Sequence, residues 1–337
     1  MNGKKEVLMR KARPTMKDVA ALAGVTQPTV SYVINGTATI SEEVKEKVNR
    51  AIKELNYEPN YTARALKTNR SEIIGILIPD ISNEYYSRMV SLISTMLRKR
   101  GYTTMVSSTN YEKDTEMDSL RKMLTYNVDG MIVAYQLLNE ECWKVLKDAG
   151  CNGVVLEGGS AAKGLSCMNT DNFYGAYEAV KFLQKQGRKY IAYVGQHTEL
   201  EAIRDRFQGY QKAMEEEGMY DPKLVCDTEG PGDKWQEGIH LGKKLLRFGA
   251  DGILVSSDIV AAGILKTFLN AGKKVPEEVA VIGYDDVPLA EVFVPALSTV
   301  AQPIREMCQF AVERVLDKRS ERKTEVLKPK LILRETT

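Results

Sequence analysis

Histidine and cysteine are scarce in this 337-residue sequence, which has two of the first and five of the second. His197 and His240 have no cysteine, second histidine or paired acid nearby at the spacing of a metal site. The cysteines are scattered and odd in number, which predicts buried thiols in a reducing compartment rather than a disulfide framework. They are Cys142, Cys151, Cys167, Cys226 and Cys308. We therefore expect neither a metal site nor disulfides.

Long apolar runs are also missing. No stretch approaches the ~20 apolar residues that a membrane helix needs. The N-terminal extension, residues 1–14 (MNGKKEVLMRKARP), is basic but lacks the apolar segment of a secretion signal. The sequence therefore predicts a protein without membrane contact, and we expect it in the cytoplasm.

The common signatures of enzymes are absent too. No GxGxxG motif follows a predicted strand, which argues against a dinucleotide-binding fold. Residues 157–164 (EGGSAAKG) are rich in glycine, but they lack the spacing of a P-loop and predict an ordinary loop. Nothing in the sequence supports a Ser-His-Asp site. We expect no enzymatic activity and no cofactor.

Charge is unevenly distributed along the chain, although the net charge is only +2. Residues 1–70 hold 13 Lys and Arg against 7 Asp and Glu, whereas the remainder holds 34 against 38. A basic N-terminal part on a slightly acidic body fits attraction to phosphates that is confined to that part. The length fits a small head followed by a two-lobed body.

Residues 15–35 (TMKDVAALAGVTQPTVSYVIN) predict two short helices joined by a tight turn. Thr15 stands at an N-cap position with Asp18 three residues on, which approximates a capping box. Gly24 suits the left-handed residue that ends a helix. Thr26 can cap the second helix, and Pro28 would lie in its first turn, where the missing N–H costs nothing.

The apolar residues of this segment fall on one face and leave a polar face for DNA. Val30, Val33 and Ile34 point inward by their spacing, and a third helix over 42–55 completes a small core. The side chains left outward are Gln27, Thr29, Ser31 and Tyr32. A helix-turn-helix presents such a helix to the major groove. The alternative is an ordinary surface helical hairpin.

A possible hinge follows the third helix. Pro59 stops the preceding structure, Asn60 can act as an N-cap, and residues 61–67 could form about two helical turns. Such a short helix is marginal alone and needs a partner to stay folded. The alternative is a plain linker.

From residue 72 onward, short apolar runs alternate with amphipathic segments. The expected strands are 73–78, 103–107, 130–134, 153–157, 190–195, 252–256 and 279–284. The expected helices include 86–100, 114–126 and 139–149. This alternation predicts an α/β body of parallel sheets covered by helices on both faces. The number of units is too large for one small sheet, so we expect two doubly wound lobes.

These residues carry a resemblance to the lactose/galactose repressor (LacI/GalR) family. It rests on DVAALAGVTQPTVSYVIN, which is followed by ISEEVKEKVNRAIKELNYEPNYTARAL. It continues through NEYY, TDNFYGA, RFQGY, SSD, VIGYDD and PALSTVAQP. The resemblance implies a sequence-specific DNA-binding transcriptional regulator, most often a repressor, whose affinity for its operator is controlled by a small effector.

The resemblance also implies the domain order. After the basic extension (1–14) come a helix-turn-helix domain (15–59) and a hinge helix with linker (60–71). Two lobes like those of a periplasmic sugar-binding protein follow, with three crossovers between them. The first lobe takes 72–171 plus 301–324, and the second takes 172–300 plus 325–337.

The DNA contacts are carried over from the family position by position. In the family, the hinge helix orders on the operator and inserts a leucine into the minor groove, which Leu66 matches here. Tyr32 replaces an arginine of many members and cannot make its bidentate contact with guanine. The full set of expected contacts is Thr15, Thr26, Gln27, Pro28, Thr29, Ser31, Tyr32, Asn35, Tyr57, Asn60, Ala63, Arg64 and Leu66.

The effector should lie beyond the carboxyl ends of the parallel strands, between the lobes. Arg206 and Asp285 match the ligand-clamping arginine and aspartate of the family and suit the hydroxyls of a sugar. The full expected set is Tyr85, Tyr86, Ser108, Tyr135, Arg206, Trp235, Ser257, Asp258 and Asp285. Trp235 is out of register by two, with Asp233 at the aligned position. We expect Asn172 to be a helix cap rather than a contact, with Arg206 and Asp285 as a structural ion pair in the alternative.

The sequence thus predicts a homodimeric regulator that binds double-stranded operator DNA and a sugar-like effector. A higher oligomer is not expected, because the C-terminus lacks a heptad repeat. Residues 86–100 and 110–123 are candidate dimer contacts. Two alternatives stay open, which are a cytoplasmic solute-binding sensor and a DNA-binding regulator controlled by a protein corepressor.

Overall fold

The computed structural model describes residues 14–36, 38–58, 70–135, 139, 141–159, 164–195, 200–229, 232–317 and 321–337. The chain divides into two compact units, Met1–Ser71 and Glu72–Thr337, and each is described by itself. We call the first unit the head and the second the body.

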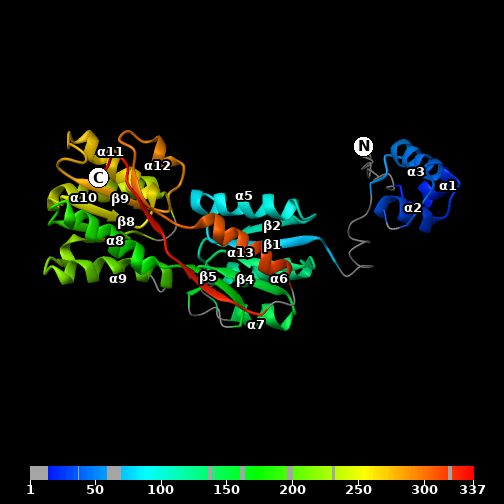
Figure 1. Ribbon diagram of the computed structural model, residues 1–337, viewed down its shortest axis with the longest axis horizontal. Coiled ribbons are helices and arrows are strands. Elements are labelled where there is room, and N and C mark those ends of the chain that lie inside the picture. Colours follow the sequence, from blue (N-terminus) through cyan, green and yellow to red (C-terminus); the bar gives the residue numbers. More distant parts are fainter. Residues whose placement is uncertain are drawn as a thin grey trace, which may run out of the picture. The chain divides into compact units, whose positions relative to one another are not determined.

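The head consists of α1 (Met16–Ala23), α2 (Gln27–Asn35) and α3 (Glu42–Glu54) (Figure 1). The predicted capping box is confirmed, since Thr15 N donates to Asp18 Oδ2 at 2.7 Å while Thr15 Oγ1 accepts from Asp18 N. Gly24 ends α1 with φ 67°. Thr26 caps α2 by accepting from the Thr29 N–H at 3.3 Å.

The core of the head is built from all three helices. Val19, Val30 and Val48 have no exposed surface, and Val25, Val33 and Ile34 pack against them. This confirms the predicted inward face of α2 and the contribution of α3 to the core. The predicted hinge helix and its Asn60, Ala63, Arg64 and Leu66 lie outside the described residues.

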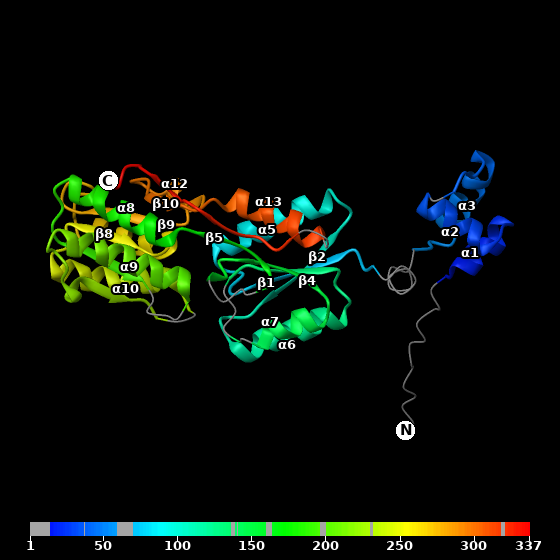
Figure 2. The same ribbon diagram turned by 60° about the horizontal axis from the view of Figure 1, so that its bottom comes forward.

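The first lobe of the body is a parallel sheet in the order β11-β5-β4-β3-β1-β2. Its strands are β1 (Ile73–Ile78), β2 (Thr103–Ser108), β3 (Gly130–Val133), β4 (Asn152–Leu156), β5 (Ser166–Thr170) and β11 (Thr324–Leu327). Figure 2 shows α5 (Glu84–Arg98) and α13 (Ile304–Leu316) over one face, and α6 (Lys113–Thr125) and α7 (Glu141–Asp148) over the other. The nearly unbroken apolar run IIGILI of β1 is buried because both faces are covered.

The second lobe has the sheet order β12-β10-β9-β8-β6-β7, parallel except for the edge strand β12. Its strands are β6 (Ile191–Gly195), β7 (Val225–Asp227), β8 (Gly252–Val255), β9 (Ala280–Tyr284), β10 (Ser298–Ala301) and β12 (Lys330–Ile332). Helices α8 (Asn172–Lys185) and α9 (Glu201–Glu216) cover one face, and α10 (Lys234–Phe248) and α11 (Asp258–Asn270) cover the other. The 3-10 helix η2 (Pro222–Leu224) and the short helix α12 (Leu289–Val292) lie in connections.

The described chain passes between the lobes at three points, as the family resemblance implies. These lie between β5 and α8, between β10 and α13, and between β11 and β12 (Figure 1). One predicted boundary is wrong. Residues 325–327 belong to the first lobe, because Thr324–Leu327 pairs in parallel with β5. No helix among the described residues is long and apolar enough to span a bilayer.

Candidate effector site and DNA-binding face

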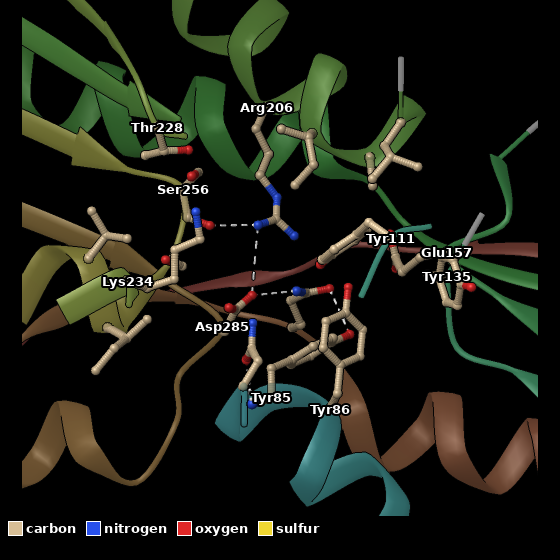
Figure 3. Close-up of a pocket in the computed structure, with 18 residues that line it drawn as sticks. Tyr85, Tyr86, Tyr111, Tyr135, Glu157, Arg206, Thr228, Lys234, Ser256 and Asp285 are labelled. Carbon is tan, nitrogen blue, oxygen red and sulfur yellow. Dashed lines mark hydrogen bonds and ion pairs between the residues drawn. The ribbon is translucent and has the colours of Figure 1, made fainter. Parts of the chain in front are cut away.

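A cavity of about 110 Å³ lies where the carboxyl ends of the two sheets meet (Figure 3). Its wall includes a residue that follows almost every parallel strand of the body. Its lining is Asn83, Tyr85, Tyr86, Tyr111, Tyr135, Glu157, Leu200, Ala202, Ile203, Arg206, Thr228, Lys234, Ser256, Ser257, Ile259, Val260, Asp285 and Gln302. Because one water needs roughly 10–15 Å³ by the same kind of measure, the cavity has room for several waters or a small polar molecule.

Arg206 enters the cavity from α9 and is 6% exposed. Its Nε donates to Asn172 Oδ1 at 2.8 Å, and its Nη1 donates to the Ser256 carbonyl at 2.8 Å. The guanidinium carbon lies 3.8 Å from the centre of the Tyr284 ring, a cation–π contact. Burial alone would lower the pKa of Arg206, but Tyr284 and Asp285 raise it. The guanidinium is therefore a fixed, permanently charged donor.

Asp285 faces Arg206 from the end of β9, and Figure 3 shows the two side chains pointing toward each other. Asp285 Oδ1 lies 3.8 Å from Arg206 Nη1 and accepts from Gln302 Nε2 at 2.6 Å. Burial raises the pKa of Asp285 to about 6, although Arg206 and the Gln302 hydrogen bond both lower it. The carboxylate is thus ionised at neutral pH but close to its titration range.

Four tyrosines form the wall contributed by the first lobe. Tyr85 and Tyr86 lie edge to face with ring centres 5.3 Å apart, and Tyr111 and Tyr135 do so at 6.2 Å. The Tyr85 hydroxyl donates to Gln302 Oε1 at 3.1 Å. The Tyr135 hydroxyl donates to the buried Glu116 at 2.9 Å. These bonds fix two of the rings, whose flat faces suit the C–H surface of a sugar.

Glu157 brings a second carboxylate to the cavity, from the end of β4. It is 8% exposed, and burial raises its pKa. Its Oε1 accepts from the Thr170 N–H at 2.7 Å, and its Oε2 accepts from Asn172 Nδ2 at 2.8 Å. These donors satisfy one side of the carboxylate and stabilise its ionised form.

Three residues of the wall have left-handed backbone conformations that only glycine adopts without cost. The φ angles are 60° at Tyr111, 57° at Glu157 and 106° at Asp285. Such conformations are strained for residues with a side chain, and they persist where the surroundings hold them, often at functional sites. Their presence around one cavity, from both lobes, supports a binding role for it.

The structure brings six of the nine predicted effector residues to the cavity. These are Tyr85, Tyr86, Tyr135, Arg206, Ser257 and Asp285. Ser108 does not line it, because its hydroxyl turns back to donate to the Pro79 carbonyl at 3.0 Å. Trp235 does not line it either, since its ring stacks on Phe293 with centres 6.2 Å apart, and Lys234 takes its place.

Asp258 is the third correction. It is the first residue of α11, and its carboxylate faces the interior of the lobe rather than the cavity. Its Oδ1 accepts from Thr299 Oγ1 at 2.6 Å, and its Oδ2 accepts from the Val287 N–H at 2.9 Å. Asp258 therefore supports the loop that follows Asp285, and Ser257 contacts the cavity instead.

The structure also changes the roles of two polar residues near helix starts. Asp171, not Asn172, caps α8 by accepting from the Tyr174 N–H at 2.9 Å. Asn172 is buried one position further on and bonds to Glu157 and Arg206. Asp233, which we weighed as a ligand contact, caps α10 by accepting from the Gln236 N–H at 3.1 Å.

Several residues of the wall were not predicted from the sequence. They are Asn83, Tyr111, Glu157, Thr228, Lys234, Ser256 and Gln302 among the polar ones. Glu157 and Gln302 directly follow β4 and β10, but the predicted strand 153–157 included Glu157 and no strand was predicted before Gln302. The rule that ligand residues follow strands therefore did not point to either residue.

The head presents the predicted polar face of α2. Thr15, Thr26, Gln27, Pro28, Tyr32 and Asn35 are exposed, while Thr29 and Ser31 are half-buried. Thr29 Oγ1 is hydrogen-bonded to Thr26 Oγ1 at 2.8 Å, and Asn35 Nδ2 donates to the Ser31 carbonyl at 2.8 Å. Tyr57 belongs to the core instead, where it is 7% exposed, so it does not present its ring as we predicted.

No group of three or more His, Cys, Asp or Glu residues in the described part of the chain has the geometry of a metal site.

Comparisons with known proteins cover both units. Residues 15–60 match the lacI family of bacterial regulatory proteins, and residues 180–337 match the periplasmic binding protein-like domain. The transcriptional repressor PurR of Vibrio vulnificus is 32% identical, over 96% of this chain and 98% of its own. The transcriptional regulator RegA of Clostridium saccharobutylicum is 33% identical, over 96% and 99%. A structure of the transcriptional regulator CelR with cellobiose is 29% identical, with a TM-score of 0.68 over 96% of this chain and all of that one.

Proposed function

The chain belongs to the LacI family of DNA-binding transcriptional regulators, and on that premise we propose that it is a repressor controlled by a neutral sugar or sugar derivative. The effector occupies the cavity between the lobes, and the head binds the operator. The protein acts in the cytoplasm, where its DNA lies. We propose a neutral effector because the positive and negative charges on the cavity wall balance one another.

The wall does not offer an unbalanced positive charge. Arg206 lies between two carboxylates, with Asp285 at 3.8 Å and Glu157 linked to it through Asn172. Lys234 Nζ is occupied by Glu237 Oε2 at 2.8 Å. A phosphate or carboxylate on the ligand would face these acids, which makes binding of an anion unfavourable. Hydroxyl groups suit the site because they can accept from the guanidinium and donate to both carboxylates.

The aromatic wall supports the same class of ligand. Tyr85, Tyr86, Tyr111 and Tyr135 line the first-lobe side of the cavity, while Arg206 and Asp285 line the second-lobe side (Figure 3). A sugar has an apolar C–H face and a polar rim, and this cavity has surfaces for both. The relative CelR is described in complex with cellobiose, which is a neutral sugar.

The head supports binding to DNA. The exposed Gln27 can pair with adenine, and the exposed Tyr32 can make one hydrogen bond or contact a thymine methyl group. Thr15 and Thr26 lie at the N-termini of α1 and α2, where backbone N–H groups favour a phosphate. Leu66 inserts into the minor groove of the operator, as the family resemblance implies, with Ala63 as the small residue before it. Asn60 and Arg64 belong to the same DNA-binding segment, in which Arg64 suits a nearby phosphate.

A homodimer would place two heads on a pseudo-palindromic operator with half-sites about one helical turn apart. We propose α5 and residues 110–123 as its contacts in the first lobe. In the second lobe, Val292 and Val294 are 73% and 86% exposed. Large apolar side chains this exposed are suited to burial against a second subunit.

The test is a selection of bound duplexes from random DNA by the full-length protein, followed by titration of the enriched duplex with neutral sugars. The proposal predicts a palindromic motif whose affinity changes with one neutral sugar. If the affinity for the motif changes with a second protein and with no sugar, a protein corepressor rather than a small effector controls binding to DNA. The absence of any motif at low salt would instead favour a solute sensor.

A further inference from the structure

Asn172 does not line the cavity, yet it contacts two charged residues that do. It is 2% exposed and is the first residue of α8, directly after the first passage between the lobes. Its Nδ2 donates to Glu157 Oε2 at 2.8 Å and to the Thr170 carbonyl at 3.1 Å. Its Oδ1 accepts from Arg206 Nε at 2.8 Å. Its side-chain amide therefore has a partner for both of its donor hydrogens and for its acceptor.

The chemistry of the three groups requires an amide at this position. A carboxylate only accepts hydrogen bonds and a guanidinium only donates them, so the group between them must do both. The amide of asparagine satisfies Glu157 and Arg206 in one orientation only. An apolar residue would leave both charged groups without these buried bonds, and an aspartate would set a second carboxylate against Glu157.

The bridge joins residues that belong to different lobes. Glu157 follows β4 in the first lobe, whereas Arg206 lies on α9 in the second. No ion pair joins them directly among the described residues, and Asn172 is hydrogen-bonded to both of them. Glu157 also has a strained backbone, with φ 57°, which the bonds to its carboxylate help to hold.

We propose that Asn172 is the positioning residue of the effector site, which aligns Glu157 and Arg206 so that their remaining polar atoms face the cavity. The inference rests on the proposed function, because it assigns both charged residues to the effector. Asn172 itself makes no contact with the effector. Its contribution is geometric, through two buried charge-assisted hydrogen bonds.

The test is a double-mutant cycle in the full-length protein, with the variants N172D, E157Q and E157Q/N172D. The matched control is N270D, which adds the same charge at the exposed far end of α11. The first readout is the melting temperature at pH 8 and pH 5.5. The charged groups around position 172 are Glu157 after β4, Arg206 on α9 and, beyond it, Asp285 after β9. Since Asp285 titrates in this range in every variant, each melting temperature is compared with that of wild type at the same pH.

At pH 8, N172D should lower the melting temperature by about 5 °C or more, because two buried carboxylates then repel each other. At pH 5.5 they can share one proton, and most of that loss should disappear. In the E157Q background the amide of residue 157 can donate to the new carboxylate at position 172. There, N172D should lower the melting temperature by less than half as much as it does in the wild-type background. An equal loss at both pH values and in both backgrounds would mean that N172D only disturbs packing, and it would overturn the bridge.

The second readout is the affinity for cellobiose and for ribose, measured by calorimetry at pH 8. For a sugar that binds wild type, N172D should weaken binding at least about tenfold, but by less than about threefold in the E157Q background. Unchanged sugar affinity in N172D, with the melting cycle as expected, would overturn the positioning role while the proposed function stands. If neither sugar binds wild type, the proposal of a sugar effector is weakened. The melting temperatures still test whether Asn172 bridges Glu157 and Arg206.

Discussion

Arg206 and Asp285 face each other on the second-lobe side of the cavity, with 3.8 Å between Nη1 and Oδ1. This distance is longer than a tight ion pair, and each group has a closer partner of its own, the Ser256 carbonyl and Gln302 Nε2. The pair is therefore held apart by other bonds, which leaves polar atoms of both groups for a ligand. We therefore predict that this pair binds the effector and is not only a structural ion pair.

Arg206→Lys keeps the charge but removes the planar fork that reaches Asn172 and the Ser256 carbonyl. Losing charge-assisted bonds worth about 1.5–3 kcal/mol each should weaken effector binding by roughly 10- to 100-fold. Affinity for operator DNA without effector should change little. Calorimetry with the sugar and a DNA titration check both points. A lysine variant with unaltered sugar affinity would show that Arg206 is structural.

The affinity for a neutral sugar should depend on pH through Asp285. The carboxylate accepts hydroxyl bonds in its ionised form, and the pKa of Asp285 is raised to about 6 by burial. Affinity should be constant above about pH 7 and fall as the pH drops through 6, approaching tenfold per unit below it. Glu157, whose pKa is also raised by burial, adds to the loss at lower pH.

Asp285→Asn should weaken the binding overall and remove the step near pH 6. The raised pKa of Asp285 also makes the stability of the fold depend on pH. The folded chain binds more protons than the unfolded chain between 3.8 and about 6, so the contribution of Asp285 to stability falls as the pH rises through that window. Titration of wild type and variant at several pH values checks the first effect, and thermal unfolding checks the second. A step of the same size in both proteins would assign it to another group.

Asp258→Asn should affect folding, whereas Ser257→Ala should affect only the effector. The Asp258 carboxylate accepts two buried hydrogen bonds, and an amide cannot accept both on separate oxygens. The expected loss is about 1–3 kcal/mol in the free energy of unfolding. Ser257 lines the cavity and is the N-cap residue of α11, but its hydroxyl makes no capping hydrogen bond, so removing it should leave stability almost unchanged. Urea unfolding of both variants checks the contrast, and equal stability would contradict the role given to Asp258.

Gln27 should determine base preference more than Tyr32 does. A glutamine can make a bidentate contact with adenine worth about 1–3 kcal/mol of discrimination, while a tyrosine makes at most one hydrogen bond. Gln27→Ala should therefore relax the selected motif at one position, and Tyr32→Phe should change it less. Selection of duplexes with each variant measures this. Identical motifs for wild type and Gln27→Ala would show that Gln27 contacts only the backbone.

The sequence was sufficient for the parts of the fold with strong local signals. Thr15, Gly24 and Thr26 determine where α1 and α2 begin and end through local hydrogen bonds and backbone conformation. The continuous apolar run 73–78 predicts a strand that is buried on both faces, and the structure places it in the interior of the sheet. Strands such as β5 (SCMNT) and β7 (VCD) were not predicted, since their short polar sequences form strands only through pairing with neighbours.

A site residue could be predicted where a single polar residue follows a strand. Where two adjacent polar residues follow a strand, the sequence did not show which of them faces the cavity. Ser257 and Asp258 are adjacent at the start of α11, where successive side chains diverge by about 100°, so only one of them could face the cavity. Asp171 and Asn172 presented the same choice, and we assigned the cap to the wrong one. Tyr111 lies in a loop, and a loop has no apolar periodicity from which the position of its side chains could be predicted. Its backbone has a left-handed conformation that the sequence does not signal.

The most direct test of the account is the affinity of the full-length protein for its selected operator, measured with and without the neutral sugar that binds wild type. The account predicts a change of roughly 5- to 150-fold, as expected for a coupling of about 1–3 kcal/mol. Because the coupling is reciprocal, the affinity for the sugar must change by the same factor when operator is bound. Equal operator affinity with and without the bound sugar would contradict the claim that this cavity controls binding to DNA.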